Sequence, residues 1–478
     1  MEPGTSGSAY SPHRRTAVIF CGTGAHGAYH AGVLRALQEA GVRIDIACGH
    51  SVGAATAMLA AIDGAGRLWD DGGVWRSRAP SRFYGWKPLI LSTGWIAALL
   101  IVVLLSPVLA LAGGMLVLAA GFLVTLVGLT NAGAELNRTA STALQLALAP
   151  ENLPTIVPRL AMVVVAALVV AASAGVFIAQ WRAPLRRQSQ GAWWWRLIGA
   201  PLEATTIRTA FASAIGELIR GATAAHRSEP GGVGRRYAEA LAENLGQPGF
   251  RELVLVVTDV DARRDLVAAL VSEPFRREFL TPRVGRDRRA EVLDLTGPDR
   301  DHALDVLASA LTPPLVCDPA LIKFSGDSLW RGETHRFCDR PDAVYRLIEE
   351  AAMAGAAQAI IVSAVAPRTG AHTLRPPRLD LKNRFGDFMM ASEAAAIRDA
   401  IETARLGFDS VYVIRPAHNP VGPFDFEGAY DEASDRKVVL AELIDEGYVD
   451  AYRQFIDPIV GASGEALGRI GVTAPANE

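Results

Sequence analysis

The chain has 478 residues, of which 50% are hydrophobic and 20% charged, with a formal net charge of −3 at pH 7. Basic residues form no tract outside the flanks of the most apolar segments, which argues against a nucleic-acid partner. The four cysteines have no Cys-x-x-Cys spacing and read as reduced thiols, and no His/Cys/carboxylate cluster suggests a site for a metal ion. We therefore expect no metal and no cofactor.

The N-terminal segment is rich in Gly, Ser and Pro and lacks the apolar core of a signal peptide, so residues 1–15 are predicted to be a disordered tail. The apolar run Ala17–Phe20 then predicts a buried strand. The Gly-rich turn Cys21–Tyr29 follows it and leads into an Ala/Leu-rich helix. Backbone N–H groups at such a helix N-terminus can stabilise an oxyanion.

A second unit of the same kind follows. Ile44–Cys48 predicts a buried strand, and Gly49-His50-Ser51-Val52-Gly53 matches G-x-S-x-G, the nucleophile elbow. Small residues flank the serine because the strand must turn sharply into a helix and leave the hydroxyl exposed. The first turn, Gly22-x-Gly24-x-x-Gly27, also fits a dinucleotide-binding fingerprint, but Asp45 heads a strand that leads straight into the elbow. The two turns in tandem favour an esterase.

Together these turns resemble the patatin-like phospholipases. Gly22–Leu34 is similar to the family's oxyanion loop and first helix, with Thr23 in place of the middle glycine and His26 in place of the usual arginine. Gly49–Ala54 is similar to its elbow. The resemblance implies a three-layer α/β/α domain with a mostly parallel sheet and a Ser51 nucleophile. It also implies an oxyanion hole at Gly22, Gly24, Ala25, His26 and Gly27, and an elbow shaped by Gly49 and Gly53.

Patatins use a Ser–Asp dyad, and the resemblance places the aspartate at Asp339. Ser309–Pro313 is similar to the family's turn before the aspartate, and Gly332–Asp339 to its hairpin. Arg340-Pro341 departs from the two small residues that usually follow the aspartate. The proline removes an N–H group, and the arginine could pair with the carboxylate and lower its basicity.

Other catalytic layouts stay open. A carboxylate can accept the serine proton directly if a dry pocket raises its pKa, and Asp327 is a weaker candidate for that acid. A Ser–Asp–His triad would instead need a histidine, for which His372 and His418 are available. Both lie in stretches that read as surface loops. His50 and His26 are expected to be bystanders in the two turns.

Two charge-free apolar runs interrupt this domain, Trp95–Leu129 and Leu160–Gln180. A bilayer span needs about 20 apolar residues, so both runs are long enough to cross a membrane. Basic residues flank the pair on both outer sides: Arg76, Arg78, Arg82 and Lys87 before it, and Arg182, Arg186 and Arg187 after it. Both flanks therefore favour the cytoplasm. Ser51 and Asp339 must also meet in one compartment, so we expect two crossings, with Trp193–Trp195 as an interfacial anchor.

The sequence thus predicts an α/β domain interrupted by a transmembrane segment. The expected regions are a tail (1–15), a first core segment with the oxyanion loop and elbow (16–86), the membrane insertion (87–198), a helical connector or cap (199–248), a second core segment with the catalytic aspartate (249–430) and a C-terminal helical extension (431–478).

The expected protein is a multi-pass, membrane-anchored serine lipid acyl hydrolase whose catalytic domain faces the cytoplasm. Its expected partners are a membrane lipid substrate and the bilayer, and the sequence points to no particular protein partner. The alternatives are a catalytically decayed patatin-like membrane scaffold and a Ser–His–Asp esterase. A transporter is disfavoured because no charged residue lies within the two apolar runs.

Overall fold

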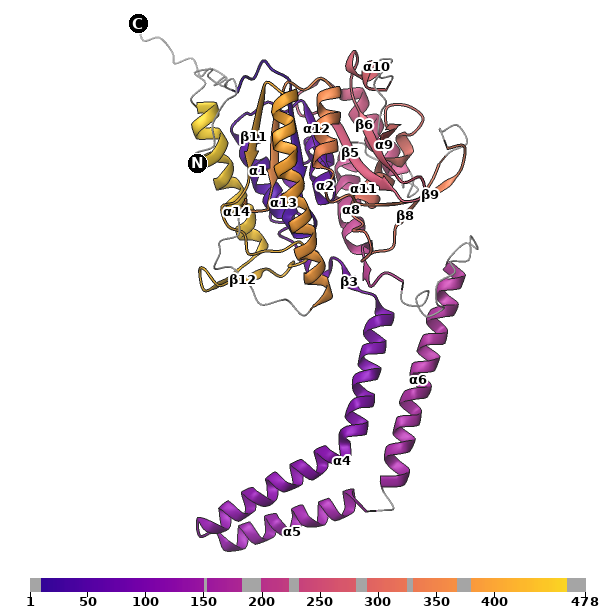
Figure 1. Ribbon diagram of the computed structural model, residues 1–478, viewed down its shortest axis with the longest axis vertical. Helices are drawn as coiled ribbons and strands as arrows, with labels where there is room; N and C mark the ends of the chain where they lie inside the picture. Colours follow the sequence, from indigo (N-terminus) through magenta and orange to yellow (C-terminus); the bar gives the residue numbers. More distant parts are fainter. Residues whose placement is uncertain are drawn as a thin grey trace. The chain divides into compact units, whose positions relative to one another are not determined.

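The computed structural model describes residues 10–149, 153–182, 199–222, 232–280, 290–324, 330–367 and 380–461. The chain divides into two compact units. Unit 1 consists of Met1–Gly85 and Leu202–Glu478, and unit 2 is Trp86–Pro201 (Figure 1). The Lys87 N–H donates to the Pro201 carbonyl at 3.0 Å, so the two ends of unit 2 lie side by side.

Unit 1 is built on a mostly parallel sheet that has nine strands among the described residues. Seven follow the order β11-β10-β1-β2-β5-β6-β7, and the β8-β9 hairpin pairs with the end of β5. The bounds are β1 Thr16–Cys21, β2 Ile46–Gly49, β5 Glu252–Asp259, β6 Arg264–Leu270, β7 Ala290–Asp294, β8 Ala320–Lys323, β9 Thr334–Cys338, β10 Gln358–Ser363 and β11 Ser410–Ile414. From β11 to β5 all neighbours are parallel, so the turns after these strands gather at one edge of the sheet.

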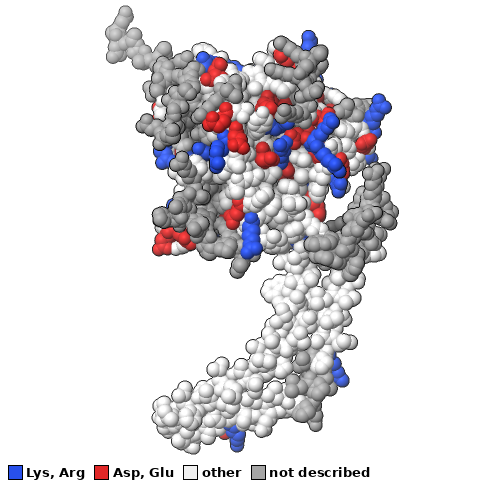
Figure 2. Space-filling model, in the orientation of Figure 1, with Lys and Arg blue, Asp and Glu red and all other residues white. Residues whose placement is uncertain are grey.

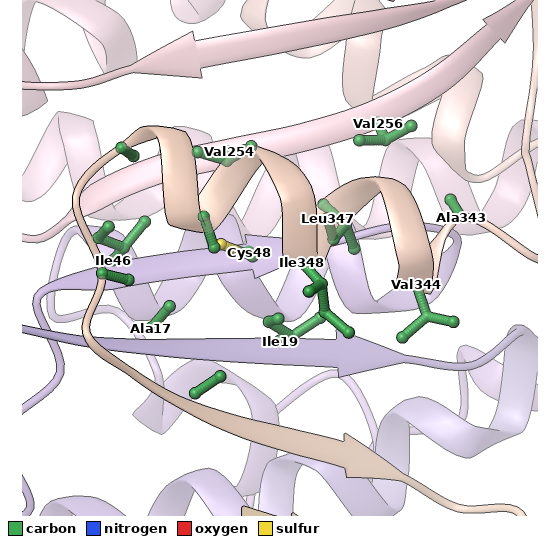
Figure 3. Close-up of a cluster of buried hydrophobic side chains, with 14 of the residues drawn as sticks. Ala17, Ile19, Ile46, Cys48, Val254, Val256, Ala343, Val344, Leu347 and Ile348 are labelled. Atoms are coloured by element: carbon green, nitrogen blue, oxygen red, sulfur yellow. The ribbon is translucent and has the colours of Figure 1, made fainter. Parts of the chain in front are cut away.

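Helices pack on both faces of this sheet (Figure 1). Alternate residues of the central strands, such as Ile19 and Cys48, contact α12, and Figure 3 shows Leu347 and Ile348 of that helix pointing at them. The intervening strand residues face α1 and α2 on the other side. The sequence prediction of a three-layer α/β/α fold with a mostly parallel sheet is thus confirmed.

The helices of unit 1 are α1 Gly27–Glu39, α2 Val52–Ala61, α3 Gly66–Trp69, α8 Thr205–Ala222, α9 Gly232–Asn244, α10 Phe275–Leu280, α11 Ala303–Ala310, α12 Val344–Met353, α13 Leu381–Gly407 and α14 Leu440–Ala451. Shorter 3₁₀ turns are η1 Gly24–His26, η2 Pro80–Arg82 and η3 Arg300–His302, and η4 Tyr452–Val460 is a π-helix. The remaining described strands form two small pairs. One is β3 Gly85–Trp86 with β4 Leu202–Glu203, and the other is the hairpin of β12 Ala429–Asp431 and β13 Arg436–Val438.

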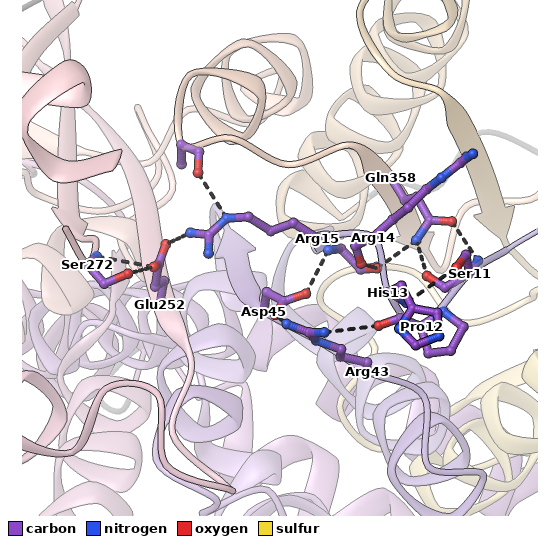
Figure 4. Close-up of polar contacts among 12 residues, drawn as sticks. Ser11, Pro12, His13, Arg14, Arg15, Arg43, Asp45, Glu252, Ser272 and Gln358 are labelled. Atoms are coloured by element: carbon purple, nitrogen blue, oxygen red, sulfur yellow. Dashed lines mark hydrogen bonds and ion pairs between the residues drawn. The ribbon is translucent and has the colours of Figure 1, made fainter. Parts of the chain in front are cut away.

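The N-terminal segment from Tyr10 onward differs from the predicted tail, because it packs against the core. Tyr10 is 1% exposed and its ring contacts Phe455. The Gln358 side chain donates to the Ser11 carbonyl at 2.8 Å, and Arg15 forms an ion pair with Glu252 (Figure 4). The Gly/Ser/Pro-rich composition conceals these anchors, and the rest of the expected tail, residues 1–9, lies outside the described residues.

The expected C-terminal helical extension, residues 431–478, also begins differently. Its first residues belong to the β12-β13 hairpin, and the helices α14 and η4 follow. The charged stretch Asp431–Lys437 has helix-like spacing in the sequence. Its backbone nevertheless turns at Asp435, where φ is +52°, which ends any helical run.

Unit 2 consists of three helices in its described part: α4 Pro88–Leu126, α5 Thr130–Ala147 and α6 Leu153–Arg182. The first bends (Figure 1) and contains Pro107, whose ring removes one helical hydrogen bond and clashes with the preceding turn. Before the bend α4 contacts α6, since Leu89 lies against Gly175. Beyond the bend it contacts α5, since Leu144 lies against Gly114.

Two helices among the described residues, Pro88–Leu126 and Pro158–Gly175, are long and apolar enough to cross a membrane. Their surface carries almost no charge on the face shown in Figure 2. A helix of 39 residues is about 58 Å long, nearly twice the thickness of a bilayer's hydrocarbon core. A bend within α4 is therefore compatible with one crossing before Pro107. The predicted anchor Trp193–Trp195 lies outside the described residues.

Candidate active site

Ser51 lies in the sharp turn between β2 and α2. Its φ of 51° and ψ of −133° are a strained conformation for a residue with a side chain. A Cβ atom on Gly49 would lie 2.2 Å from the Gly53 carbonyl oxygen, and a Cβ on Gly53 would lie 2.2 Å from the Phe20 carbonyl oxygen. Only glycine therefore fits on either side of the serine, which explains the motif that the sequence carries.

Asp339 follows directly after β9, at the same edge of the sheet. Cys338 pairs with Thr258 of β5, and the Asp339 N–H donates to the Thr312 carbonyl at 2.8 Å. These contacts hold the carboxylate against the elbow, where the Ser51 hydroxyl donates a hydrogen bond to Asp339 Oδ2. The two residues are 288 positions apart in the chain, and their side chains are 1% and 2% exposed.

Burial controls the acidity of this aspartate. Removal of water from the buried carboxylate raises the pKa of Asp339 to about 7. The hydrogen bond from Ser51 lowers this pKa but does not offset the effect of burial. Its second oxygen, Oδ1, has no hydrogen-bond partner in the part of the chain that the structure describes. A carboxylate with a pKa near neutrality is well matched to proton transfer at physiological pH.

The arginine after the aspartate does not neutralise it. Arg340 forms ion pairs with Asp265 and Asp342 and not with Asp339. The sequence raised the concern that this arginine lowers the basicity of Asp339. Its pairing with two other carboxylates removes that concern.

The first glycine turn has the backbone geometry of a tight loop. Gly22 and Gly24 have φ values of +143° and +58°, which a residue with a side chain rarely adopts. A Cβ atom on Gly24 would lie 2.0 Å from the carbonyl oxygen of Pro423. The loop is thus clamped against a second loop that arrives from the far end of the sequence.

That clamp changes which amides are available to an oxyanion. The Ala25 N–H donates to the Pro423 carbonyl at 2.8 Å, and the His26 N–H to the Thr23 carbonyl at 3.3 Å. The Gly27 N–H is bonded within the 3₁₀ turn. Three of the five residues expected from the sequence therefore have engaged amides in this conformation. No acceptor is found among the described residues for the N–H of Thr23 or Gly24.

Two further side chains touch the serine, and sequence reasoning assigned a role to neither. The Thr23 hydroxyl donates to Ser51 Oγ at 3.2 Å, and His50 Nδ1 lies 3.2 Å from the same oxygen. The sequence offered one sign of the Thr23 contact, since threonine stands at a position where the family usually has glycine. For His50, burial lowers the pKa to about 4, so its imidazole is neutral at physiological pH.

The other predicted histidines and acids lie elsewhere. His26 is buried in η1, and burial lowers its pKa to about 4. His418 bonds to Asp431 of β12 at 2.9 Å, and no hydrogen bond joins it to Ser51 within the described ranges. Asp327 and His372 lie outside the described residues.

A cavity lies beside Asp339, and several aromatic rings lie beside the first glycine turn. A cavity of about 460 Å³ opens at Asp339 and is lined by Arg263, Arg264 and Pro314, among others. Aromatic rings stand by the oxyanion loop: Phe426 lies next to Gly24, and its ring contacts Phe83 and Tyr84 edge-on or tilted. These three rings are at most 6% exposed, so they form a packed wall beside the turn. In the described residues no group of three or more His, Cys, Asp or Glu side chains could hold a metal ion.

Comparison with known proteins adds the following. A family model described as patatin-like phospholipase matches residues 18–339, a range that begins in β1 and ends at Asp339. Among solved structures, the chain is similar to VipD from Legionella pneumophila, with 13% sequence identity and a TM-score of 0.28 over 93% of this chain and 67% of that one. Curated proteins offer no match.

Proposed function

Since the chain belongs to the patatin-like phospholipase family, it is a lipid acyl hydrolase, and we propose that Ser51 is its nucleophile and Asp339 its general base. The observation that carries this assignment is the buried hydrogen bond from Ser51 Oγ to Asp339 Oδ2. It joins a residue in a strained elbow to a carboxylate whose pKa is raised to about 7. Both properties are typical of a nucleophile and its base.

In the proposed reaction, the Asp339 carboxylate takes the proton of Ser51 as Oγ attacks the carbonyl carbon of a lipid ester. The carbonyl oxygen becomes negative and accepts hydrogen bonds from the amides of Thr23 and Gly24, which have no acceptor among the described residues. The bond to the alcohol then breaks, and Asp339 returns its proton to the leaving oxygen. Water, deprotonated by the same carboxylate, hydrolyses the acyl-enzyme and releases the fatty acid.

His50 is the rival base, because its Nδ1 lies 3.2 Å from Ser51 Oγ. A group with a pKa of about 4 is a weaker base than one with a pKa of about 7. The carboxylate is therefore favoured as the proton acceptor. His50 and the Thr23 hydroxyl instead orient the serine, each through one contact to its oxygen.

The proposed location is a membrane, with α4 and α6 as two crossings and unit 1 on the cytoplasmic side. The apolar, nearly uncharged surface of both helices supports insertion, and the adjacent ends of unit 2 support an even number of crossings. The basic flanks support the orientation. This location would hold the catalytic unit close to its lipid substrate.

The competing candidate is a decayed scaffold, and the near-complete burial of Ser51 favours it, because a substrate needs access that this conformation does not provide. Labelling with a fluorophosphonate in membranes separates the two functions. We expect the wild type to label, Ser51→Ala to be silent and Asp339→Asn to label far more slowly. Asp399→Asn, which removes an exposed carboxylate of α13, is the control and should label normally. Folded wild type that does not label would favour the scaffold.

A further inference from the structure

A groove of about 630 Å³ in unit 1 is lined by neither Ser51 nor Asp339. It is lined by a short segment that precedes α4 in the chain, together with residues of the β12-β13 region. Three arginines, Arg76, Arg78 and Arg82, contribute to this lining, and Trp75 and Phe426 provide its aromatic portion. We call this surface the arginine groove.

The guanidinium groups of the arginine groove are only partly neutralised. Arg76 lies 3.7 Å from both Asp71 and Asp445, which are long contacts for an ion pair. Arg78 and Arg82 are exposed, and neither has an ion pair in the described part of the chain. Besides Asp71, one other carboxylate lines the groove, that of Glu427. Three arginines therefore face two carboxylates in the lining, and Arg78 and Arg82 have no carboxylate partner among the described residues to compete with an anion.

Trp75 offers a second, independent observation. Its side chain is 2% exposed, and its indole N–H is buried without an acceptor within the described residues. Buried polar groups in folded proteins normally have a partner. Because Trp75 lines the arginine groove, an anionic oxygen bound there is a candidate for the missing acceptor.

Arginine also indicates the kind of anion. Its planar guanidinium offers paired N–H donors that match the geometry of a phosphate, whereas a point charge such as lysine does not. The hydroxyls of Ser77 and Ser81 already donate to the backbone carbonyls of Val74 and Arg78, so recognition depends on the arginines.

The position in the chain indicates the source of that phosphate. Arg82 precedes Pro88, the first residue of α4, by six positions, and six residues span at most about 22 Å. If α4 enters a bilayer as proposed, lipid headgroups come within reach of the arginine groove. We infer that this groove binds the headgroup phosphate of an anionic membrane lipid. The inference rests on the proposed membrane insertion and not on the assignment of the dyad.

Binding in the arginine groove would also touch the wall of the catalytic site. Phe426 lines the groove, and its ring also lies next to Gly24 of the oxyanion loop. Trp75 lies in contact with Gly27, at the start of α1. An anionic lipid held here therefore contacts residues that support the loop, at a place distinct from Ser51.

Lipid binding can be tested on the full-length Ser51→Ala protein, which removes turnover from the measurement. The protein in neutral, phosphate-free detergent is titrated with dioctanoyl phosphatidylglycerol or with dioctanoyl phosphatidylcholine, and bound lipid is counted by native mass spectrometry. We expect phosphatidylglycerol to bind about tenfold more tightly, because both lipids present one phosphate but the choline cation of phosphatidylcholine is repelled by the excess positive charge of the groove. This preference should weaken as salt is added.

Substitution then locates the binding. Arg78→Gln with Arg82→Gln should abolish the preference for the anionic lipid, and each single variant should reduce it. The matched control combines Arg277→Gln with Arg398→Gln, two exposed arginines outside the groove, and should keep the preference. Equal binding of both lipids, or a preference that survives in the groove variant, would overturn the inference. Displacement by inorganic phosphate at similar concentration would also overturn it, because the ligand would then be a soluble phosphate.

The two proposals fail separately. Fluorophosphonate labelling of the wild type reports on the dyad, whereas lipid counting on the Ser51→Ala protein reports on the arginine groove. A labelled wild type without lipid preference rejects the groove alone. An unlabelled wild type with a groove-dependent preference rejects the catalytic assignment alone.

Discussion

Replacement of Asp339 by asparagine examines the proposed base directly, because the amide keeps the shape of the carboxylate but cannot accept the serine proton. A positioned general base contributes about 10²- to 10⁴-fold to the rate, and we expect kcat/KM to fall within that range. The wild-type rate should follow the ionised fraction of Asp339, whose pKa is about 7. Activity should therefore rise about tenfold per pH unit up to pH 7 and level off above it.

The assay is hydrolysis of a soluble p-nitrophenyl ester by the detergent-solubilised protein, with kcat/KM measured across the pH range on both sides of neutrality. Asp339→Asn should give a low rate without this rise. Asp399→Asn should keep the wild-type plateau, because that side chain is exposed on α13 and does not contact Ser51 or Asp339. A wild-type rise centred near pH 4, or an Asp339→Asn protein with wild-type activity, would refute the reasoning.

The raised pKa of Asp339 should also be visible in the pH dependence of thermal stability. The folded pKa of Asp339 is raised from 3.8 to about 7, so the folded protein holds a proton that the unfolded chain releases between these values. Wild type should then lose stability relative to Asp339→Asn as the pH rises from about 4 to 7, by about 4 kcal/mol in total, and no further above pH 7. Melting temperatures of the two proteins, compared at pH 4 and pH 8, measure this difference. A difference independent of pH would mean that the carboxylate is not buried.

Three further changes test other regions of the structure. Thr23→Ala removes the hydroxyl that contacts Ser51 Oγ and should lower kcat about tenfold, whereas Thr23→Ser should restore it. Gly53→Ala places a methyl group 2.2 Å from a carbonyl oxygen and should cost more than about 3 kcal/mol, while Gly72→Ala, with open space around it, should leave the melting temperature unchanged. Replacement of 87–201 by a short Gly/Ser turn should release unit 1 from the membrane fraction with its esterase activity intact, because residues 87 and 201 are already hydrogen-bonded neighbours. Loss of ester hydrolysis in a folded, soluble product would contradict this last expectation.

Local sequence signals predicted the two glycine turns well, because each turn's chemistry lies within a few residues. A side chain at Gly49 would clash with the backbone of Gly53, and a side chain at Gly53 would clash with the backbone of Phe20 in β1. A strand that turns sharply into a helix already implies such close backbone contacts. The approach of Asp339 needed the family resemblance, since no local pattern links residues 288 positions apart. In the folded sheet the approach comes from β9, which pairs antiparallel with the end of β5, the strand next to β2.

The remaining features depend on tertiary contacts that periodicity does not encode. The Ala25 amide is engaged by Pro423, so the available oxyanion donors could not be identified from the loop alone. Tyr10 is held by Phe455, although its neighbours have the composition of a disordered tail. In both cases the contacting residue lies about 400 positions or more away in the chain. Its position is known only once the whole domain has folded.

A further experiment distinguishes the two causes that raise the pKa of Asp339, burial and repulsion from a neighbouring charge. Burial is the largest cause of the increase, and repulsion from Asp342 is the smallest of the causes identified. Salt screens the interaction between exposed charges but does not return water to a buried carboxylate. The pH at which the rate levels off should therefore stay near 7 from low to high ionic strength. A shift toward lower pH with added salt would show that neighbouring charges, and not burial, make this aspartate a base.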